Sequence, residues 1–165
     1  MGKNRIEALM RRVNEMPRLT VALNIVCYLC TFISVFTFGY TLMYFLLRTW
    51  VLAAKYCLAL GLAFVIVSVV RRLINAPRPY QLYDFFVKPP RERRGNSFPS
   101  RHAFSAFAIG TFCLFVNPFV GGLTLLFGLV MCVCRVALGI HFVRDVVCGA
   151  LIGVVSSVVA ALIIL

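Results

Sequence analysis

The chain has 165 residues, of which 62% are hydrophobic and 13% charged, and its mean hydropathy is +0.95. This length allows one domain, and a soluble core of this size could not bury so much apolar surface. The composition therefore excludes a soluble globular protein and predicts an integral membrane protein. The net charge of +12 does not indicate nucleic-acid binding. Nearly all basic residues lie in the N-terminal arm or between apolar runs, where they match anionic lipid headgroups.

Residues 1–18 are polar and basic, with apolar side chains recurring at helical spacing. These side chains are Ile6, Leu9, Met10, Val13 and Met16. The pattern predicts an amphipathic helix that lies in the membrane interface. We expect residues 19–165 to form a single transmembrane domain.

Five apolar runs then predict an all-α fold, a polytopic bundle of about five transmembrane helices. The runs cover Leu19–Leu47, Val51–Val70, His102–Asn117, Phe119–Val136 and Val143–Leu165. The third is short for a span, since crossing a bilayer takes about 20 residues. Residues 71–101 form the only long polar segment, and prolines there rule out one continuous helix.

Seven cysteines lie inside the apolar runs, where a cysteine behaves as a small hydrophobic residue. Cys27 and Cys30 have the spacing of a CxxC pair, but no second pair or nearby histidine accompanies them. A metal site is therefore not predicted.

Ionisable residues gather where apolar runs end. The segment Cys134–Asp145 contains Arg135, His141 and Asp145. Such residues are costly at membrane depth, so they usually face a polar cavity and serve chemistry or transport. His141 and Asp145 are four residues apart, so on a helix they would share a face. The acid could then orient the histidine and activate it as a base or nucleophile.

Two further clusters have the same placement. Pro99–His102 opens the third run and holds the only other histidine, and Arg71–Pro79 closes the second run. We therefore expect one anion site built from all three clusters. Arg71, Arg78 and Arg135 supply guanidinium groups suited to phosphate. Ser100 stands before a helix start, whose N–H groups and dipole favour an anion.

This set of residues fits phosphoryl transfer, in which positioning and electrostatic stabilisation do most of the work. One histidine could attack phosphorus while the other protonates the leaving oxygen, and covalent catalysis of this kind needs no metal. The acidic residues form no cluster able to hold two divalent ions. They are Glu7, Glu15, Asp84, Glu92 and Asp145. We expect no cofactor.

The three clusters resemble the type 2 phosphatidic acid phosphatases, whose active site is shared with vanadium haloperoxidases. That family has the patterns K-x6-R-P, P-S-G-H or P-S-R-H, and S-R-x5-H-x3-D. This chain has Arg71-x6-Arg78-Pro79, then Pro99-Ser100-Arg101-His102, then Cys134-Arg135-x5-His141-x3-Asp145. The motifs follow the family order, and together they are highly specific.

The resemblance implies that His141 is the nucleophile, Asp145 its partner and His102 the acid for the leaving group. The phosphate-binding residues that it implies are Arg71, Arg78, Ser100, Arg101 and Arg135. Arg71 replaces the family's usual lysine and Cys134 its usual serine. We expect activity to survive both changes, with a shift in substrate preference. Membrane members usually have six spans, so this chain is expected to lack one at its N-terminal end.

Charge also predicts an orientation. If the N-terminal arm and residues 71–101 share a side, that side carries every Lys and Arg except Arg48 and Lys55. The positive-inside rule then favours an active site on the cytoplasmic face of a bacterial cell membrane. In bacterial members of the family, the active site more often lies on the outer face of the membrane.

The expected function is hydrolysis of a phosphate or diphosphate monoester of a membrane lipid through a phosphohistidine. Phosphatidic acid, phosphatidylglycerophosphate and a polyprenyl diphosphate all fit, and the sequence indicates no oligomeric state. The alternatives are an inactive protein on the same fold and an anion-binding or transport protein. Intact His102, His141 and Asp145 count against the first, and nearly pure apolar spans count against the second.

Overall fold

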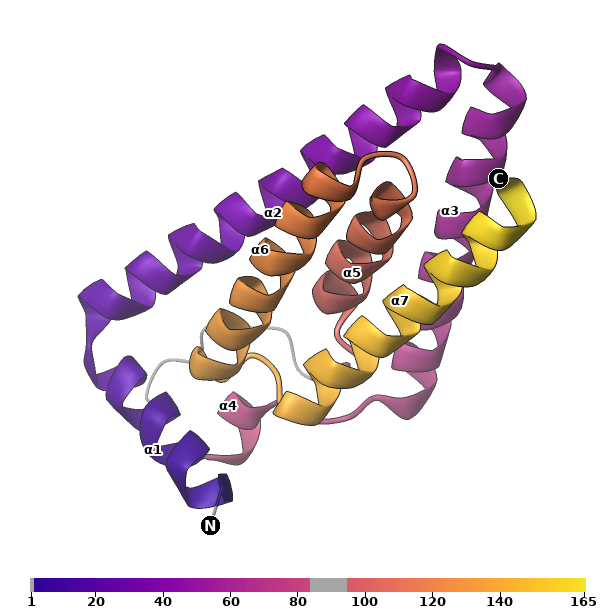
Figure 1. The fold of residues 1–165 in the computed structure, drawn as a ribbon. Helices are drawn as coiled ribbons and strands as arrows, with labels where there is room; N and C mark the ends of the chain where they lie inside the picture. Colours follow the sequence, from indigo (N-terminus) through magenta and orange to yellow (C-terminus); the bar gives the residue numbers. More distant parts are fainter. Residues whose placement is uncertain (1, 84–94) are drawn as a thin grey trace.

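The computed structural model describes residues 2–83 and 95–165, which form seven helices and no strand (Figure 1). The helices are α1 (Gly2–Glu15), α2 (Pro17–Leu46), α3 (Trp50–Ile74), α4 (Pro79–Leu82), α5 (Arg101–Leu114), α6 (Pro118–Ala137) and α7 (Val143–Ile164). The predicted all-α membrane bundle is confirmed. Two of the acids considered above, Asp84 and Glu92, lie outside the described residues.

Four of the described helices, α2, α3, α6 and α7, are long and apolar enough to cross a membrane. The remaining predicted span corresponds to α5, which has only 14 residues. It packs against all four long helices and lies inside the bundle (Figure 1). Because protein rather than lipid surrounds much of it, α5 does not need the length of an independent span.

Small residues allow α5 and α7 to approach closely. Gly149 and Gly153 are spaced four apart on α7, so they lie on one face of this helix. A Cβ atom at Gly149 would lie 2.4 Å from the carbonyl oxygen of Ser100, and one at Gly153 would lie 2.5 Å from that of Phe104. Only glycine permits this distance between the helices, as in other small-residue helix contacts in membranes.

Hydrogen bonds align the same two helices. The Ser157 hydroxyl donates to the carbonyl oxygen of Ala108 at 2.7 Å. At the other end, the N–H of Ser100 donates to the carbonyl oxygen of Asp145 at 2.9 Å. The beginning of α5 is thereby held against the beginning of α7.

Helix α1 confirms the helical prediction for the N-terminal segment, although α2 already begins at Pro17. Met10 and Val13 of α1 are buried, and α1 packs against α2 and α6. Glu7 accepts a hydrogen bond from the Tyr83 hydroxyl at 2.9 Å. Placement of α1 in the membrane interface stays a prediction.

The chain directions bring the three polar clusters to one end of the bundle. The C-terminal ends of α3 and α6 and the N-terminal ends of α5 and α7 lie there, close to α4 (Figure 1). The turns between α2 and α3 and between α5 and α6 lie at the opposite end. A site built from the clusters therefore opens at this end of the helices.

Candidate active site

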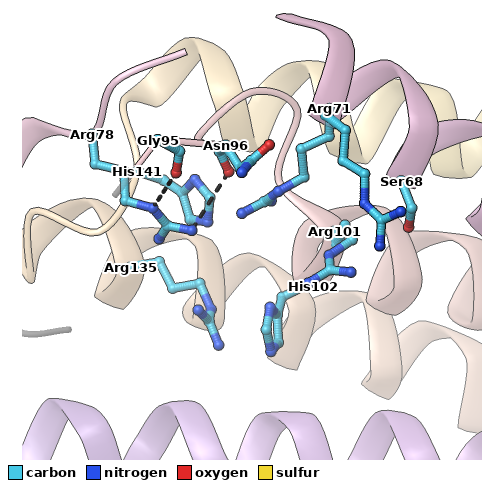
Figure 2. A pocket seen from close by; sticks show the side chains of 10 residues that line it. Ser68, Arg71, Arg78, Gly95, Asn96, Arg101, His102, Arg135 and His141 are labelled. Carbon is cyan, nitrogen blue, oxygen red and sulfur yellow. Dashed lines mark hydrogen bonds between the residues drawn. The ribbon is translucent and has the colours of Figure 1, made fainter. Parts of the chain in front are cut away.

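A cavity of about 330 Å³ lies at this end of the bundle (Figure 2). Six of its lining residues are predicted site residues, and they come from all three clusters. They are Arg71, Arg78, Arg101, His102, Arg135 and His141. The fold thus brings together residues that are up to 70 positions apart in sequence.

The end of α6 positions His141. Gly139 has a positive φ of 66°, its N–H donates to the carbonyl oxygen of Val136, and the N–H of Ile140 donates to that of Arg135. These contacts define a Schellman motif, which reverses the chain after a helix. As a result Arg135, in the last turn of α6, and His141, beyond the helix, line the same cavity.

His141 has a carboxylate behind it. Its Nδ1 atom lies 3.5 Å from Oδ2 of Asp145, which is fully buried in the first turn of α7. The two residues do not share a helix, as their spacing of four would allow, because α7 begins at Val143, after His141. Because Nδ1 faces Asp145, the other ring nitrogen, Nε2, lies on the opposite edge of the imidazole and is available to the cavity.

Ser97 completes this arrangement and was missed by the sequence analysis. It is fully buried, its hydroxyl donates to Oδ2 of Asp145, and its Oγ lies 3.4 Å from Nδ1 of His141. The N–H of Phe142 donates to the same carboxylate oxygen at 3.0 Å. Three groups therefore converge on Oδ2 of Asp145, which fixes the carboxylate beside the histidine.

His141 is only 1% exposed, and its environment opposes a positive charge. The pKa of His141 is lowered from 6.5 to about 4, chiefly by burial, because the charged ring would lose its hydration. The hydrogen bond with Asp145 opposes this shift, whereas the positive charges of Arg78, Arg135 and Arg71 contribute to it. The imidazole is therefore neutral at pH 7 and keeps a lone pair.

Arg78 is held by backbone carbonyl groups from two loops. Its guanidinium donates to the carbonyl oxygens of Gly95 at 3.0 Å, Ile140 at 3.4 Å and Asn96 at 3.5 Å. Figure 2 shows the bonds to Gly95 and Asn96. Gln81 accepts from the backbone N–H groups of Arg78 and Gly95 through Oε1. This network fixes both Arg78 and the segment that begins at Gly95.

The other arginines are also constrained. Arg71 is buried and donates to the carbonyl oxygen of Pro99 at 3.0 Å. Arg135 is buried as well, and the Arg101 guanidinium carbon lies 5.7 Å from the centre of the Phe64 ring. Guanidinium groups held in this way are preorganised for an anion.

Ser100 stands directly before α5, at the helix start where the sequence analysis expected it. It is fully buried, and its hydroxyl accepts from the N–H of Ala103 at 3.5 Å, so it caps α5. Within the described chain, the residues that line the cavity do not include Ser100 or Asp145. Direct binding of phosphate by Ser100 stays a prediction, while His102, two residues later, does line the cavity.

Four lining residues were absent from the predicted set: Ser68, Arg72, Gly95 and Asn96. Ser68 and Arg72 have a local signal, because they stand one turn apart at the end of α3 next to Arg71. Gly95 and Asn96 both have positive φ, which a Gly-Asn pair in a loop favours. Among the described residues, no three His, Cys, Asp or Glu side chains are grouped to hold a metal ion.

Two solved structures illustrate the similarity of the fold. The crystal structure of Aquifex aeolicus LpxE matches with a TM-score of 0.69 and 26% identity, covering 93% of this chain and 92% of that chain. A transmembrane PAP2-type phosphatidylglycerolphosphate phosphatase from Bacillus subtilis matches with a TM-score of 0.64 and 22% identity. That match covers 96% of this chain and 83% of the Bacillus chain.

A curated relative is the bacitracin transport permease protein BcrC of Bacillus licheniformis, 28% identical over 102 residues. The match covers 58% of this chain and 49% of that protein, so the chain spans about half the length of this relative. The model of the PAP2 superfamily matches residues 52–165, a region that contains every charged residue of the cavity. With its apolar helices and its matching fold, this integral membrane protein belongs to the PAP2 superfamily.

Proposed function

We propose that this protein is a lipid phosphatase that hydrolyses a phosphate or diphosphate monoester of a membrane lipid without a metal ion. One observation carries the proposal. A neutral histidine, backed by a buried carboxylate, faces a cavity lined by five arginines. A nucleophile in a cationic cavity is what phosphoryl transfer requires, because negative charge spreads over the phosphoryl oxygens.

In the first step, Nε2 of His141 attacks phosphorus. The P–N bond forms, the bond from phosphorus to the lipid oxygen breaks, and the electron pair leaves with that oxygen. His102, in its protonated form, gives a proton to the leaving oxygen. The ring of His141 becomes cationic as it is phosphorylated, and Asp145 stabilises that charge through Nδ1–H.

In the second step, water attacks the phosphohistidine. His102, now neutral, accepts a proton from the water as the new P–O bond forms. The P–N bond breaks, its electron pair returns to Nε2 of His141, and inorganic phosphate leaves. The arginine guanidinium groups hold the phosphoryl oxygens through both steps.

The fold supports a lipid as the substrate. The cavity lies where the apolar helices end, so a phosphate headgroup could enter it while the hydrocarbon tail stays in the bilayer. The distribution of Lys and Arg described above favours the cytoplasmic face for this end of the bundle.

The test is phosphate release by the purified protein in detergent with EDTA present. The substrates are phosphatidic acid, phosphatidylglycerophosphate and a polyprenyl diphosphate, and His141→Ala is the control. We expect release that survives EDTA and is lost in the variant. We also expect an acid-labile, alkali-stable phosphate on the wild-type protein after rapid quenching, and none on the variant.

Loss of activity with EDTA would refute the metal-independent mechanism. Undiminished release by His141→Ala would refute the nucleophile. A folded protein that releases phosphate from no lipid would instead favour an inactive or anion-binding member of the family.

A further inference from the structure

A groove of about 270 Å³ lies between α6 and α7, separate from the active-site cavity. No described residue lines both spaces. Helices α6 and α7 touch each other little, and both pack on α5, whose Phe107 also lines the groove. The groove therefore results from the way in which two helices are mounted on a third.

The walls of the groove are apolar stripes on the two helices. In each stripe the second, third and fourth residues follow the first by three, four and seven positions, so they share a helix face. The α6 stripe consists of Leu129, Cys132, Val133 and Val136, and the α7 stripe of Val143, Val146, Val147 and Ala150. The α6 stripe is about 10 Å long. All described residues that line the groove are apolar, so it suits a hydrocarbon chain.

The exposure of these residues shows that the groove is concave. Leu129, Val133 and Val147 are each at least half exposed, whereas Cys132 and Val146 between them are buried. Projecting rims and a buried floor make a channel along the outside of the bundle. Because α6 and α7 are long and apolar enough to cross a membrane, this channel faces the acyl chains of the bilayer.

Helix α1 lies at the end of the bundle where α6 ends and α7 begins (Figure 1). Its Leu9 lines the groove, Arg5 stands four residues before Leu9, and Arg12 stands three residues after it. The three side chains therefore share a face of α1. Both arginines are exposed, and neither has an ion-pair partner among the described residues.

The two acids of α1 do not neutralise this face. Glu15 pairs with Arg11 at 3.2 Å, and Glu7 accepts the hydrogen bond from Tyr83. The positive charges stand where the apolar helices end, which is the level of the lipid headgroups. Arginines at the end of an apolar groove match the charge of an anionic lipid.

We propose that the groove and α1 form a binding site for an anionic membrane lipid. One acyl chain lies between α6 and α7, and the phosphate of the headgroup contacts Arg5 and Arg12. This lipid is a bound constituent of the membrane and is distinct from the substrate, since no described residue of the groove lines the active-site cavity. The site does not depend on the reaction proposed above.

The bound chain supports the helices that carry the active site. It packs against Val136 of α6 and Val146 of α7. Val136 directly follows Arg135, and Val146 directly follows Asp145. The chain thus fills the space behind two elements that hold site residues, and it stabilises the folded protein.

The experiment measures lipid binding to the detergent-purified protein by native mass spectrometry. The probes are phosphatidylglycerol and phosphatidylcholine with identical acyl chains. We expect phosphatidylglycerol to bind about 25-fold more tightly, because each of two arginines near a headgroup contributes about fivefold. Phosphatidylglycerol should also raise the unfolding temperature, since it binds the folded protein.

Variants separate the headgroup contact from the chain contact. Arg5→Gln and Arg12→Gln should each reduce the preference for phosphatidylglycerol about fivefold. Arg11→Gln makes the same charge change on another face of α1 and should keep the preference. Ala150→Leu fills the groove and should weaken both lipids about tenfold, the effect of excluding two methylene groups. Ala54→Leu, at an exposed position of α3 outside the groove, is its control and should weaken neither.

Four results would overturn the proposal. Equal affinity for the two lipids, or an equal loss of preference in Arg11→Gln, means that no headgroup site exists on this face of α1. Unchanged affinity in Ala150→Leu means that the chain lies elsewhere. A dimer that Ala150→Leu converts to monomers means that the groove binds a second copy of the chain. Displacement of the lipid by inorganic phosphate at constant ionic strength means that the lipid lies in the active-site cavity. Thermal unfolding without lipid shows whether each variant is folded.

Discussion

Replacing Ser97 by alanine tests whether the buried cluster behind His141 sustains catalysis. The hydroxyl of Ser97 donates to Oδ2 of Asp145 and lies 3.4 Å from Nδ1 of His141. Ser97→Ala removes one of the three groups that converge on this carboxylate and leaves His141 and Phe142 in place. Ser97 touches no substrate atom in the proposed mechanism, so it is a positioning residue.

The expected magnitude follows from the type of bond. A hydrogen bond to a charged group contributes about 1.5–3 kcal/mol, and each 1.4 kcal/mol is about tenfold in rate. Asp145 matters most when His141 becomes cationic, because the carboxylate then stabilises a full positive charge. We therefore expect Ser97→Ala to lower kcat about 10- to 100-fold, with a smaller change in KM.

Ser157→Ala is the matched control. Ser157 is also fully buried and also donates one hydrogen bond, to the carbonyl oxygen of Ala108, but it lies far along α7 from the cavity. Ser157→Ala should lose about 1 kcal/mol of stability, the usual contribution of one hydrogen bond between neutral groups, and Ser97→Ala about 1.5–3 kcal/mol, because its partner is a carboxylate. Thermal unfolding in detergent and single-turnover phosphate release measure the two effects separately.

Full activity of Ser97→Ala would refute the reasoning, because Asp145 would then position His141 without it. Equal activity losses in Ser97→Ala and Ser157→Ala would show that destabilisation alone accounts for the effect.

Two further predictions concern the helix contact and the nucleophile. Gly149→Ala should destabilise the protein by about 1–3 kcal/mol and lower activity, because the added Cβ atom would meet the carbonyl oxygen of Ser100. Gly122→Ala is the control and should change neither stability nor activity, because a Cβ atom there meets nothing within 4 Å. Equal unfolding temperatures for the two variants would contradict the close helix contact. NMR of protein labelled at its two histidines should show His141 neutral down to about pH 5, with His102→Asn assigning the signals. Acidification from pH 7 to pH 4 should then lower stability, because only the unfolded chain takes up this proton near pH 6.5. A His141 titration near pH 6.5 in the folded protein would contradict its burial.

Much of the fold was predictable because its signals are local. Apolar runs predict the long helices, and clusters that contain charged residues follow the runs that become α3 and α6. The Schellman motif after α6 needs one residue with a positive φ, and Gly139 provides it, since glycine adopts this conformation without strain. The length of an apolar run predicted the helices less well. Helix α5 is too short for an independent span, and it packs against the four long helices around it.

Motif spacing in the sequence predicted the site residues. Six of them line the cavity, and they come from three separate segments of the chain. It placed Ser100 at a helix start, and the structure shows this residue buried as the cap of α5. It also missed Ser97, because a serine in a polar loop carries no periodicity that marks it.

The sequence by itself determined that this protein is a helical membrane protein, and it predicted one anion site where the helices end. The reason is that the length of an apolar run and the spacing of a motif are properties of short segments, and they do not depend on how the rest of the chain folds. Only the tertiary structure decided which side chains meet. Ser97 reaches Asp145 across 48 residues, where glycines let α5 and α7 pack closely. Ser68 of α3 and Arg101 of α5 line one cavity because the tertiary fold brings these helix ends together.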